Sequence, residues 1–319
     1  MLLALRILAA LVLIVAVVAV ATWWRASARK AAAEAAYPPE GQFVAVDGHP
    51  VHYVQKGAGP DVVLIHGASG NTRDMTFSFM DRLTDRYRVT VFDRPGHGYT
   101  PRLALSGVTV ADQADLLLGA AEQLGVTRPV VVGQSFGGAV AMAWAVRHPE
   151  QTAAVVSIAG ATHPWEGALD RLYATVAAPW IGRPLAWLIS ALVPMGYVDS
   201  QVEGVFTPQT EPEGYAQRIG LGLIMRPENL LANAHQRTDL REELRVMRHK
   251  YPNLMMPIEI LHGTADDIVG LEVHAEKLAQ EAPDAQLTTL PGIGHMPHHV
   301  APGAVEAAID RAAAKAGLL

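Results

Sequence analysis

The sequence predicts an α/β protein in which a largely parallel β-sheet is covered by helices on both faces. Short apolar segments typical of buried strands recur from residue 43 onward, and amphipathic stretches typical of helices, such as residues 110–125 and 136–149, lie between them. The chain has 319 residues, of which 50% are hydrophobic, so one large domain with room for a lid is expected. In sheets of this class, ligands bind beyond the carboxyl ends of the strands.

The N-terminal segment is long and apolar enough to span a bilayer. Residues 7–24 read ILAALVLIVAVVAVATWW, with basic side chains on both sides and two tryptophans where interfacial anchors belong. A secretory signal peptide is the alternative, since Ala19-Val20-Ala21 resembles a cleavage site, but the apolar run is longer than the usual signal-peptide core. We therefore expect residues 1–24 to be a single-pass membrane anchor. The basic residues after the segment favour a cytoplasmic body, and a cleaved signal would instead give a periplasmic or secreted one.

Residues 25–41 follow this segment and contain alanine as their only core-forming aliphatic residue. They end in a Pro-Pro pair and a glycine, so we expect a juxtamembrane helix or linker. The folded core is expected to comprise residues 42–161 and 251–319, with its first strand starting near Gln42.

Eight short segments of this core have the apolar, β-branched composition of strands. Their alternation with helical segments predicts crossover connections and hence a mostly parallel sheet. The predicted strands cover residues 43–46, 50–55, 62–66, 88–93, 130–133, 154–160, 257–263 and 286–292.

Residues 162–250 interrupt this alternation and are expected to form a helical cap, or lid. The segment contains Trp165, Trp180 and Trp187 and an apolar stretch at residues 178–195. A second membrane span is disfavoured there because prolines and a glycine break the first half of the stretch. Two alternatives stay open: the apolar stretch covers a substrate pocket, or its tryptophans only pack the cap onto the core.

A serine between glycines follows the fifth predicted strand. Gly133-Gln134-Ser135-Phe136-Gly137 joins the valine-rich segment to the predicted helix at 136–149. A sharp strand-to-helix turn strains the serine backbone, and glycines two residues away let neighbouring elements approach closely. Because such a turn presents the hydroxyl above the sheet, we predict that Ser135 is a nucleophile.

A serine hydroxyl needs a base to remove its proton, usually a histidine oriented by a carboxylate. Asp266 and Asp267 follow the seventh predicted strand, and His295 follows the last one. The chain order Ser135, Asp266, His295 is the order found in serine hydrolases whose nucleophile lies on a strand-turn-helix element.

Together these segments resemble the α/β-hydrolase superfamily, in its capped, serine esterase- and lipase-like branch. The resemblance rests on five stretches of the core and covers neither the N-terminal segment nor the cap. The stretches are HGASG at 66–70, DRPGHG at 93–98, GQSFG at 133–137, the loop at 263–269 and GH at 294–295.

The resemblance implies an eight-stranded sheet and a catalytic triad. Ser135 would be the nucleophile, His295 the general base and then acid, and Asp266 the carboxylate that orients it, because the family places this acid three residues after the glycine that ends the strand. The backbone N–H groups of Ala68 and Phe136 would form the oxyanion hole.

The neighbouring residues have other expected roles. Asp267 would be a solvated or helix-capping neighbour of the acid. His298 and His299 would lie on the surface or in the pocket wall. His66 would hold the oxyanion loop, and His97 would belong to a turn.

Composition and motifs exclude several function classes. The formal net charge of −6, with no sustained basic cluster in the body, disfavours a nucleic-acid partner. The absence of cysteine excludes disulfides and thiolate chemistry. No metal-ligand spacing or phosphate-binding loop occurs, so we expect no metal and no cofactor. A serine at position 135 also excludes the carboxylate-nucleophile chemistry of epoxide hydrolases and haloalkane dehalogenases.

We therefore expect a serine hydrolase that cleaves an ester-type bond of a small or medium apolar substrate through an acyl-enzyme intermediate. Carboxylic esters are the first expectation, with thioesters and lactones as related substrates. Two alternatives with the same fold are a carbon-carbon bond hydrolase and a cofactor-free haloperoxidase. An alternative of another class is a non-catalytic, membrane-tethered ligand-binding protein.

Overall fold

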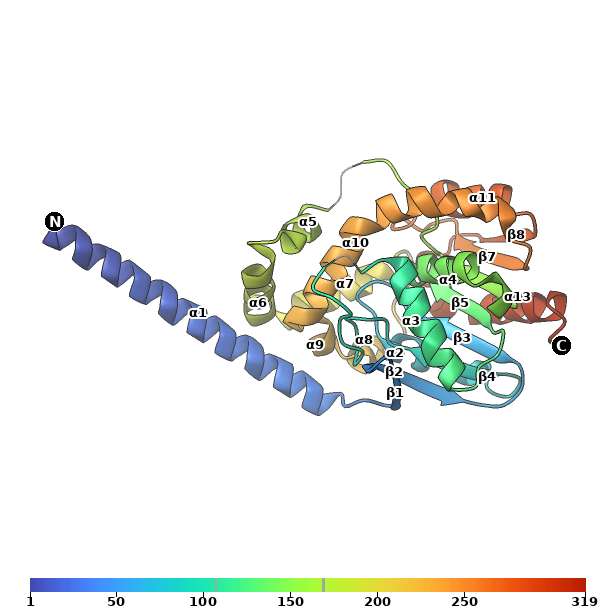
Figure 1. Cartoon of the computed structure of the whole chain (residues 1–319), viewed down its shortest axis with the longest axis horizontal. Helices are drawn as coiled ribbons and strands as arrows, with labels where there is room; N and C mark the ends of the chain where they lie inside the picture. The colour runs from blue at the N-terminus through green and yellow to red at the C-terminus, as the bar shows by residue number, and fades with distance from the viewer. Residues whose placement is uncertain (107, 168–169) are drawn as a thin grey trace.

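The protein is built on an eight-stranded sheet with helices on both faces (Figure 1), which confirms the predicted fold class. The structure is a computed structural model, and it describes residues 1–106, 108–167 and 170–319. The strand order is β1-β2-β4-β3-β5-β6-β7-β8. β2 pairs antiparallel with β1 and β4, and the other neighbouring strands pair in parallel. The strands are β1 (Gln42–Val46), β2 (His49–Lys56), β3 (Asp61–Ile65), β4 (Arg88–Phe92), β5 (Val130–Gln134), β6 (Ala154–Ile158), β7 (Ile258–Gly263) and β8 (Ala285–Leu290).

The central strands are buried on both faces, which is why their sequences are continuously apolar. In β3, Val63 and Ile65 belong to one core cluster, whereas Val62 and Leu64 belong to the cluster on the opposite face. The first cluster is completed by α3 (Val110–Gln123), α4 (Phe136–Arg147) and α11 (Leu271–Glu281), and the second by α13 (Pro302–Lys315) and α2 (Thr72–Thr76).

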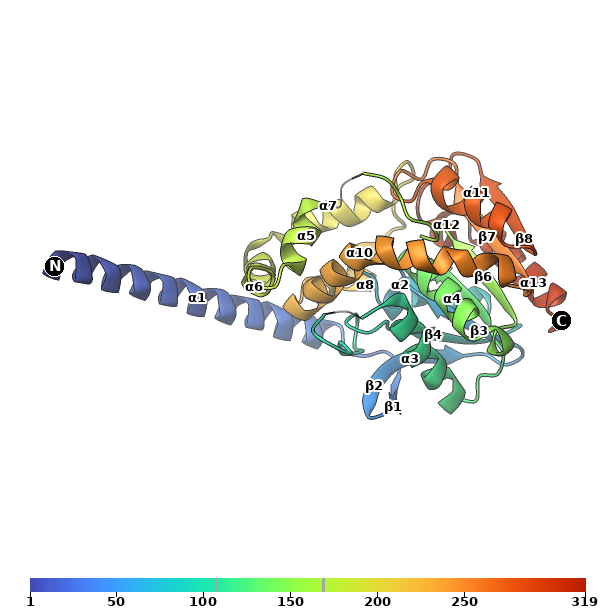
Figure 2. The same cartoon turned by 45° about the horizontal axis from the view of Figure 1, so that its top comes forward.

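Helices α5 to α10 form the cap between β6 and β7. They are α5 (Arg171–Ala177), α6 (Gly182–Leu192), α7 (Met195–Val205), α8 (Tyr215–Ile219), α9 (Leu221–Ile224) and α10 (Pro227–Met247). The long helix α10 passes over the carboxyl ends of the strands and packs against α5 and α6 (Figure 2). The remaining helices are α12 (Pro297–Val300) and short 3₁₀ turns at Met80–Arg82, Pro149–Gln151 and Arg248–Asn253.

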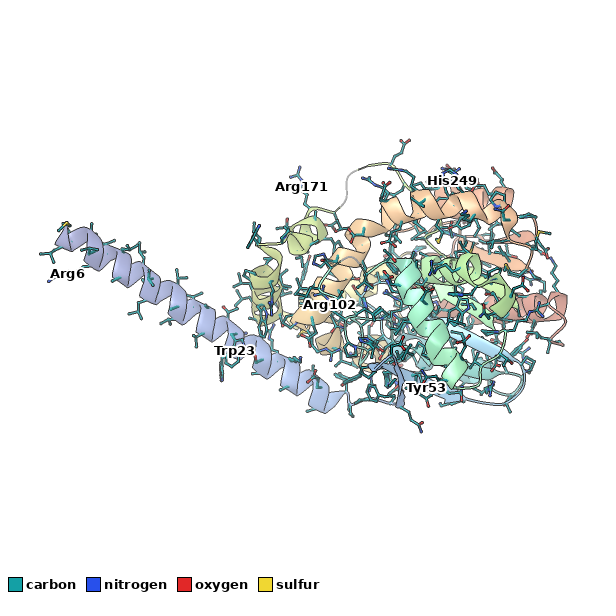
Figure 3. All side chains as sticks on the ribbon, in the orientation of Figure 1. Arg6, Trp23, Tyr53, Arg102, Arg171 and His249 are labelled. Carbon is teal, nitrogen blue, oxygen red and sulfur yellow. The ribbon has the colours of Figure 1, made fainter. Side chains whose placement is uncertain are left out.

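Helix α1 (Leu2–Ala36) is 35 residues long and projects from the body of the protein (Figure 1). Its apolar first part, which carries Arg6 and Trp23, is exposed (Figure 3) and has the length and composition of a membrane span, a test that a signal sequence would also pass. At about 1.5 Å per residue, the helix is much longer than the roughly 30 Å hydrocarbon core of a bilayer. The remaining turns are therefore available for contacts with the cap.

The helix continues without a break through residue 25, where the sequence suggested the start of a juxtamembrane helix or linker. Its second half lies along the cap (Figure 2). Arg25 Nε donates to the carbonyl of Ala191 at 2.7 Å, and Arg29 Nη1 donates to the carbonyls of Ser190 and Val193 at 2.9 and 2.8 Å. These carbonyls belong to the last turn of α6, where backbone acceptors lack partners within the helix. The two arginines therefore cap α6 and join α1 to the cap.

Candidate active site

Ser135 occupies a strained turn between β5 and α4. Its φ and ψ are 52° and −117°, a conformation that costs a non-glycine residue about 1 to 3 kcal/mol. Hydrogen bonds to the end of β6 and the loop after it hold the turn: Ser135 N donates to the carbonyl of Ile158, and Ala161 N donates to the carbonyl of Ser135, both at 3.0 Å. The serine is thereby fixed at the carboxyl end of the sheet.

The two flanking glycines are required by close backbone contacts. A Cβ on Gly133 would lie 2.1 Å from the carbonyl oxygen of Gly137, and a Cβ on Gly137 would lie 2.2 Å from the carbonyl oxygen of Ile65. No real Cβ makes contacts this short, so each position excludes a side chain. This is the steric requirement that the sequence pattern around the serine predicted.

The loop after β3 lies directly beside this turn. A Cβ on Gly67 would lie 3.2 Å from the Cβ of Ser135, so the loop backbone and the serine are in contact. Ala68, Ser135 and Phe136 line one pocket of about 380 Å³. The loop is also held from the cap, because Ser69 N donates to Asn233 Oδ1 at 3.0 Å. The predicted nucleophile and the two predicted oxyanion residues thus share one cavity.

Asp266 and His295 are in contact in the loops after β7 and β8. His295 Nδ1 lies 2.8 Å from Asp266 Oδ2, and both side chains are buried. The backbone N–H groups of Ile268 and Val269 donate to Asp266 Oδ1 at 2.9 and 3.0 Å. Asp267, by contrast, is exposed to solvent. Of the two candidate acids, the structure therefore brings Asp266 to the histidine.

Asp266 has a second histidine partner that the sequence analysis missed. His262, in β7, places Nε2 3.3 Å from Asp266 Oδ2 and 2.7 Å from the carbonyl oxygen of Val269. Burial alone would raise the pKa of Asp266, but hydrogen bonds from His262 and His295 outweigh burial and hold this pKa well below its usual range. The acid is therefore ionised at neutral pH, and its negative charge stabilises a proton on His295 Nδ1.

The two halves of the predicted triad lie on adjoining segments. Gln134, which precedes the serine, donates from Nε2 to the carbonyl of His295 at 3.1 Å. Within the described part of the chain, no hydrogen bond joins Ser135 Oγ to His295. In ligand-free enzymes this contact is often long and tightens when substrate binds.

Arg94 organises the loop that carries Ala68. Its buried guanidinium donates to the carbonyls of His66 and Gly67 at 3.0 and 2.8 Å, and also to the side chains of Gln113 and Gln236. Burial lowers the pKa of Arg94 to about 9, which leaves it charged at neutral pH. The guanidinium also lies over the ring of Phe136.

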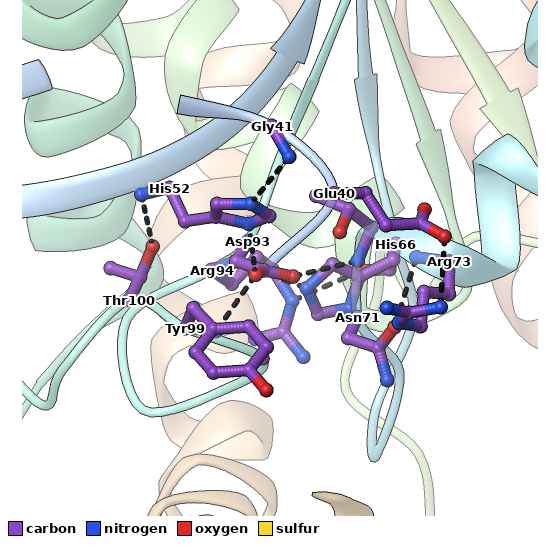
Figure 4. Close-up of polar contacts among 12 residues, drawn as sticks. Glu40, Gly41, His52, His66, Asn71, Arg73, Asp93, Arg94, Tyr99 and Thr100 are labelled. Carbon is purple, nitrogen blue, oxygen red and sulfur yellow. Dashed lines mark hydrogen bonds and ion pairs between the residues drawn. The ribbon is translucent and has the colours of Figure 1, made fainter. Parts of the chain in front are cut away.

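His66 completes this arrangement. Its Nδ1 is 2.9 Å from the carbonyl oxygen of Gly67, and its Nε2 accepts from Arg94 N at 3.0 Å. Burial, followed by the charge of Arg94, lowers the pKa of His66 to about 4, so the ring is neutral. Asp93, next in this network, accepts from Thr72 N and Tyr99 N and contacts His52 Nδ1 at 2.7 Å (Figure 4). These polar contacts hold the two loops after β3 and β4 together.

His298 and His299 are not surface residues, and no described pocket has either of them in its wall. Both side chains are fully buried and contact Asp74 Oδ1 through Nε2, at 3.4 and 2.9 Å. Tyr215, from α8, donates to the same oxygen at 2.7 Å. The three Asp and His side chains lie close enough to share a metal ion, but the carboxylate already receives a hydrogen bond from each of its neighbours. This cluster joins α2 and α12 to the cap.

The cap contributes residues to the pocket wall, but they do not come from the apolar stretch at 178–195, which was one of the two expectations for that stretch. No residue of that stretch is in the described pocket wall, and Trp180 is 91% exposed. The stretch instead forms α6, which packs against α1. Trp165 both lines the pocket and packs on the core. The other cap residues of the pocket wall are Asp170, Tyr173, Arg237, Thr238 and Leu240.

Comparisons with known proteins agree with this architecture. A family model described as "Alpha/beta hydrolase family" matches residues 62–308. Haloalkane dehalogenase 2 of Mycobacterium tuberculosis is 26% identical over 286 residues, which is 86% of this chain and 94% of that protein. The dihydrolipoyllysine-residue acetyltransferase component of the acetoin cleaving system of Cupriavidus necator is 40% identical over 119 residues, but the match spans only 37% of this chain and 31% of that protein.

A solved structure resembles the chain along almost its whole length. The crystal structure of a membrane phospholipase A, described as a bacterial virulence factor, superimposes with a TM-score of 0.63 at 25% identity. The match covers 96% of this chain and 98% of that one. Since the 35-residue α1 is more than a tenth of the chain, the matched region must include part of it.

Proposed function

The chain belongs to the alpha/beta hydrolase family, and on that premise we propose that it is a membrane-anchored serine hydrolase that cleaves carboxylic ester bonds through an acyl-enzyme intermediate. The observation that carries the proposal is the arrangement around Ser135: a strained serine in the wall of a pocket that Ala68 and Phe136 also line, and a buried Asp266–His295 pair in the adjoining loops. A hydrolase is also what the family and the dehalogenase relative indicate. The serine at the nucleophile position favours acyl transfer over dehalogenation.

The proposed reaction uses each of these groups in turn. Because His295 Nδ1–H donates to Asp266, its Nε2 carries the lone pair that removes the proton from Ser135 Oγ as the oxygen attacks the ester carbonyl. The N–H groups of Ala68 and Phe136 stabilise the oxyanion. Collapse breaks the bond to the alcohol, which leaves with the proton from Nε2. Water then attacks the acyl-enzyme, again with His295 as base, and releases the carboxylic acid and the serine.

The position of the cap favours a lipid-like ester as substrate. Helix α6 and the turn before it expose several apolar side chains beside the anchor-like helix α1. If α1 spans a membrane, these side chains face the bilayer surface and the cap lies next to its lipids. The likeness to a membrane phospholipase A is consistent with such a substrate. The exposed apolar residues are Trp180, Ile181, Leu188 and Leu192.

The test is hydrolysis of p-nitrophenyl esters, from acetate to palmitate, by the full-length protein in non-ionic detergent. We expect turnover by the wild type with a preferred acyl length set by the 380 Å³ pocket, and we expect Ser135→Ala to lose it by a factor of about 10³ or more. Ser200→Ala, an exposed serine on α7, is the matched control and should behave as wild type. Full turnover by Ser135→Ala would contradict the assignment of Ser135 as the nucleophile. Binding of esters without any turnover by the wild type would contradict the proposal and favour a binding protein.

A further inference from the structure

A strongly basic side chain stands in the described wall of the pocket beside Ser135. Arg237, from α10, lines the pocket together with Ser135, and its Cζ lies 4.2 Å from the centre of the Tyr173 ring. The guanidinium of Arg94, also beside the site, is instead fully buried and donates to backbone carbonyls and glutamine side chains outside the pocket wall. Among residues 1–106, 108–167 and 170–319, no carboxylate lies within ion-pair distance of Arg237. A partly buried guanidinium of this kind attracts a negatively charged group.

The ring of Tyr173 fixes how the guanidinium is presented. A cation over an aromatic face is attracted to the ring, and stacking orients the plane of an arginine. The planar group of Arg237 then has N–H donors left to make two parallel hydrogen bonds to one carboxylate or phosphate. Lysine, which carries a point charge, could not make this paired contact.

His274 adds a neutral donor to the same pocket. Its Nδ1 accepts from Thr162 N and His163 N, both at 3.1 Å, so the single proton of the neutral ring is on Nε2. Burial, followed by the neighbouring histidines His163 and His262, lowers the pKa of His274 to about 3, and the ring therefore stays neutral at physiological pH. The pocket wall thus contains a charged donor and a neutral donor whose tautomer is fixed by the backbone.

We propose that this pocket binds an ester that carries an anionic group, a carboxylate or a phosphate, and that Arg237 is the residue that recognises the charge. This inference rests on the proposed ester hydrolase activity and specifies its substrate class. The apolar members of the wall, among them Trp165, Leu240 and Val273, would contact the hydrocarbon part of the same molecule.

Among the described residues of the pocket wall, Asp170 is the one acidic side chain, and it is already engaged. Its Oδ1 accepts from Leu172 N at 2.8 Å and so caps the start of α5. Its charge nevertheless reduces the positive potential that Arg237 creates. Replacing it by asparagine, which also caps helices well, is therefore expected to strengthen the binding of anions, whereas replacing Arg237 is expected to weaken it.

The first experiment measures binding without turnover. Full-length Ser135→Ala protein in non-ionic detergent is titrated calorimetrically with 4-phenylbutyrate and with 4-phenylbutanol, which differ in charge but share the same hydrocarbon body. We expect the carboxylate to bind more tightly, and the added Arg237→Met substitution to weaken its binding about tenfold to a hundredfold. Arg237→Lys should restore part of this loss. Arg245→Met, about two turns further along α10, exposed and outside the described pocket wall, is the matched control and should change nothing.

The second experiment measures specificity in turnover and separates the two sources of charge. The ratio of kcat/KM for p-nitrophenyl hemiglutarate to that for p-nitrophenyl valerate tests a carboxylate on the acyl side. The same ratio for butyryl glycerol phosphate to monobutyrylglycerol tests a phosphate on the alcohol side. We expect Arg237→Met to lower at least one ratio by about tenfold or more, and Asp170→Asn to raise it.

The outcomes distinguish this inference from the proposed function. If Arg237→Met changes neither the affinity for 4-phenylbutyrate nor the two kcat/KM ratios, the anionic subsite is overturned, even when neutral esters are hydrolysed. Anion binding that depends on Arg237, combined with no ester turnover, would contradict only the proposed hydrolase activity.

Discussion

The guanidinium of Arg94 lies 4.4 Å from the centre of the Phe136 ring. The same guanidinium donates to the carbonyls of His66 and Gly67, which immediately precede Ala68. One buried cation therefore contacts both chain segments that we propose to supply the oxyanion hole. Ordinary side-chain substitutions leave backbone donors in place, and proline, which removes the N–H, also constrains the backbone itself. The residue that positions these donors therefore offers the better route to test them.

We predict that Arg94→Lys lowers kcat about tenfold to a hundredfold while KM changes little. Lysine keeps the charge but cannot donate to both carbonyls and both glutamines at once, so the loop of Ala68 shifts and stabilises the oxyanion less well. Kinetics on p-nitrophenyl butyrate measure the effect. Arg88→Lys is the control, because Arg88 and its partner Asp61 lie at the amino ends of β4 and β3, away from the proposed site. A folded Arg94→Lys protein with unchanged kcat would contradict this role.

His262 is predicted to act through Asp266. Replacing it by alanine removes a hydrogen-bond donor from Asp266 Oδ2, so the pKa of Asp266 should rise toward its usual value and its hold on His295 should weaken. We expect kcat to fall about tenfold with little change in KM, and His262→Gln, which keeps a side-chain donor, to recover part of the loss. If the alanine and glutamine variants were equally impaired in kcat and equally destabilised, His262 would be only a packing residue.

The contacts from α1 to α6 are predicted to stabilise the cap. The double variant Arg25→Met and Arg29→Met removes three hydrogen bonds to the last turn of α6. Since charged donors to orphaned carbonyls contribute on the order of 1 kcal/mol each, amide hydrogens of α6 should exchange about fivefold to a hundredfold faster. Hydrogen exchange followed by mass spectrometry checks this, with Arg6→Met at the free end of α1 as control. Equal exchange in α6 would show that these arginines serve another purpose.

Glu243 is predicted to make the protein less stable as the pH rises. Burial raises its pKa from the ordinary value of 4.5 to about 7, although its Oε2 accepts from Val110 N at 2.6 Å. The folded state therefore binds this proton more tightly than the unfolded state does. The resulting stabilisation is complete below about pH 4.5 and is lost as the pH rises through about 7.

The measurement is the free energy of unfolding of Glu243→Gln and wild type between pH 5 and pH 8. Glutamine keeps the oxygen acceptor and cannot ionise, so the variant should gain up to about 3 kcal/mol relative to wild type over this range. Glu242→Gln, an exposed neighbour paired with Arg245, is the control. A pH-independent difference for Glu243→Gln would contradict the burial of its charge.

The sheet could be predicted from the sequence because its strands are buried on both faces. The short, continuously apolar segments of β3, β5, β6 and β7 are typical of such strands. Ser135 lies in a turn whose close backbone contacts require glycine at positions 133 and 137. Both the apolar strand pattern and the glycines that flank Ser135 can be recognised within one short stretch of sequence. The Asp266–His295 contact could be anticipated because each residue follows a strand end on the same edge of the sheet.

Contacts between distant segments could not be predicted. The alanine-rich residues after Arg25 have high helix propensity, but nothing in the sequence says that Arg25 and Arg29 would reach the last turn of α6. The apolar residues of the stretch at 178–195 do not cover the pocket: some pack against α5 and α10, and others are exposed beside α1. The roles of Arg94 and His262 depend on three-dimensional neighbours that no local motif specifies.

The measurement that tests the central claim most directly is labelling of the full-length protein with a fluorophosphonate, with the modified residue identified by peptide mass spectrometry. An activated serine attacks the phosphorus and expels fluoride, whereas an ordinary serine does not react. We predict a single adduct on Ser135 that is absent in Ser135→Ala and unaffected in Ser200→Ala. A wild-type protein that remains unlabelled, or an adduct on another residue, would contradict the assignment of Ser135 as the nucleophile.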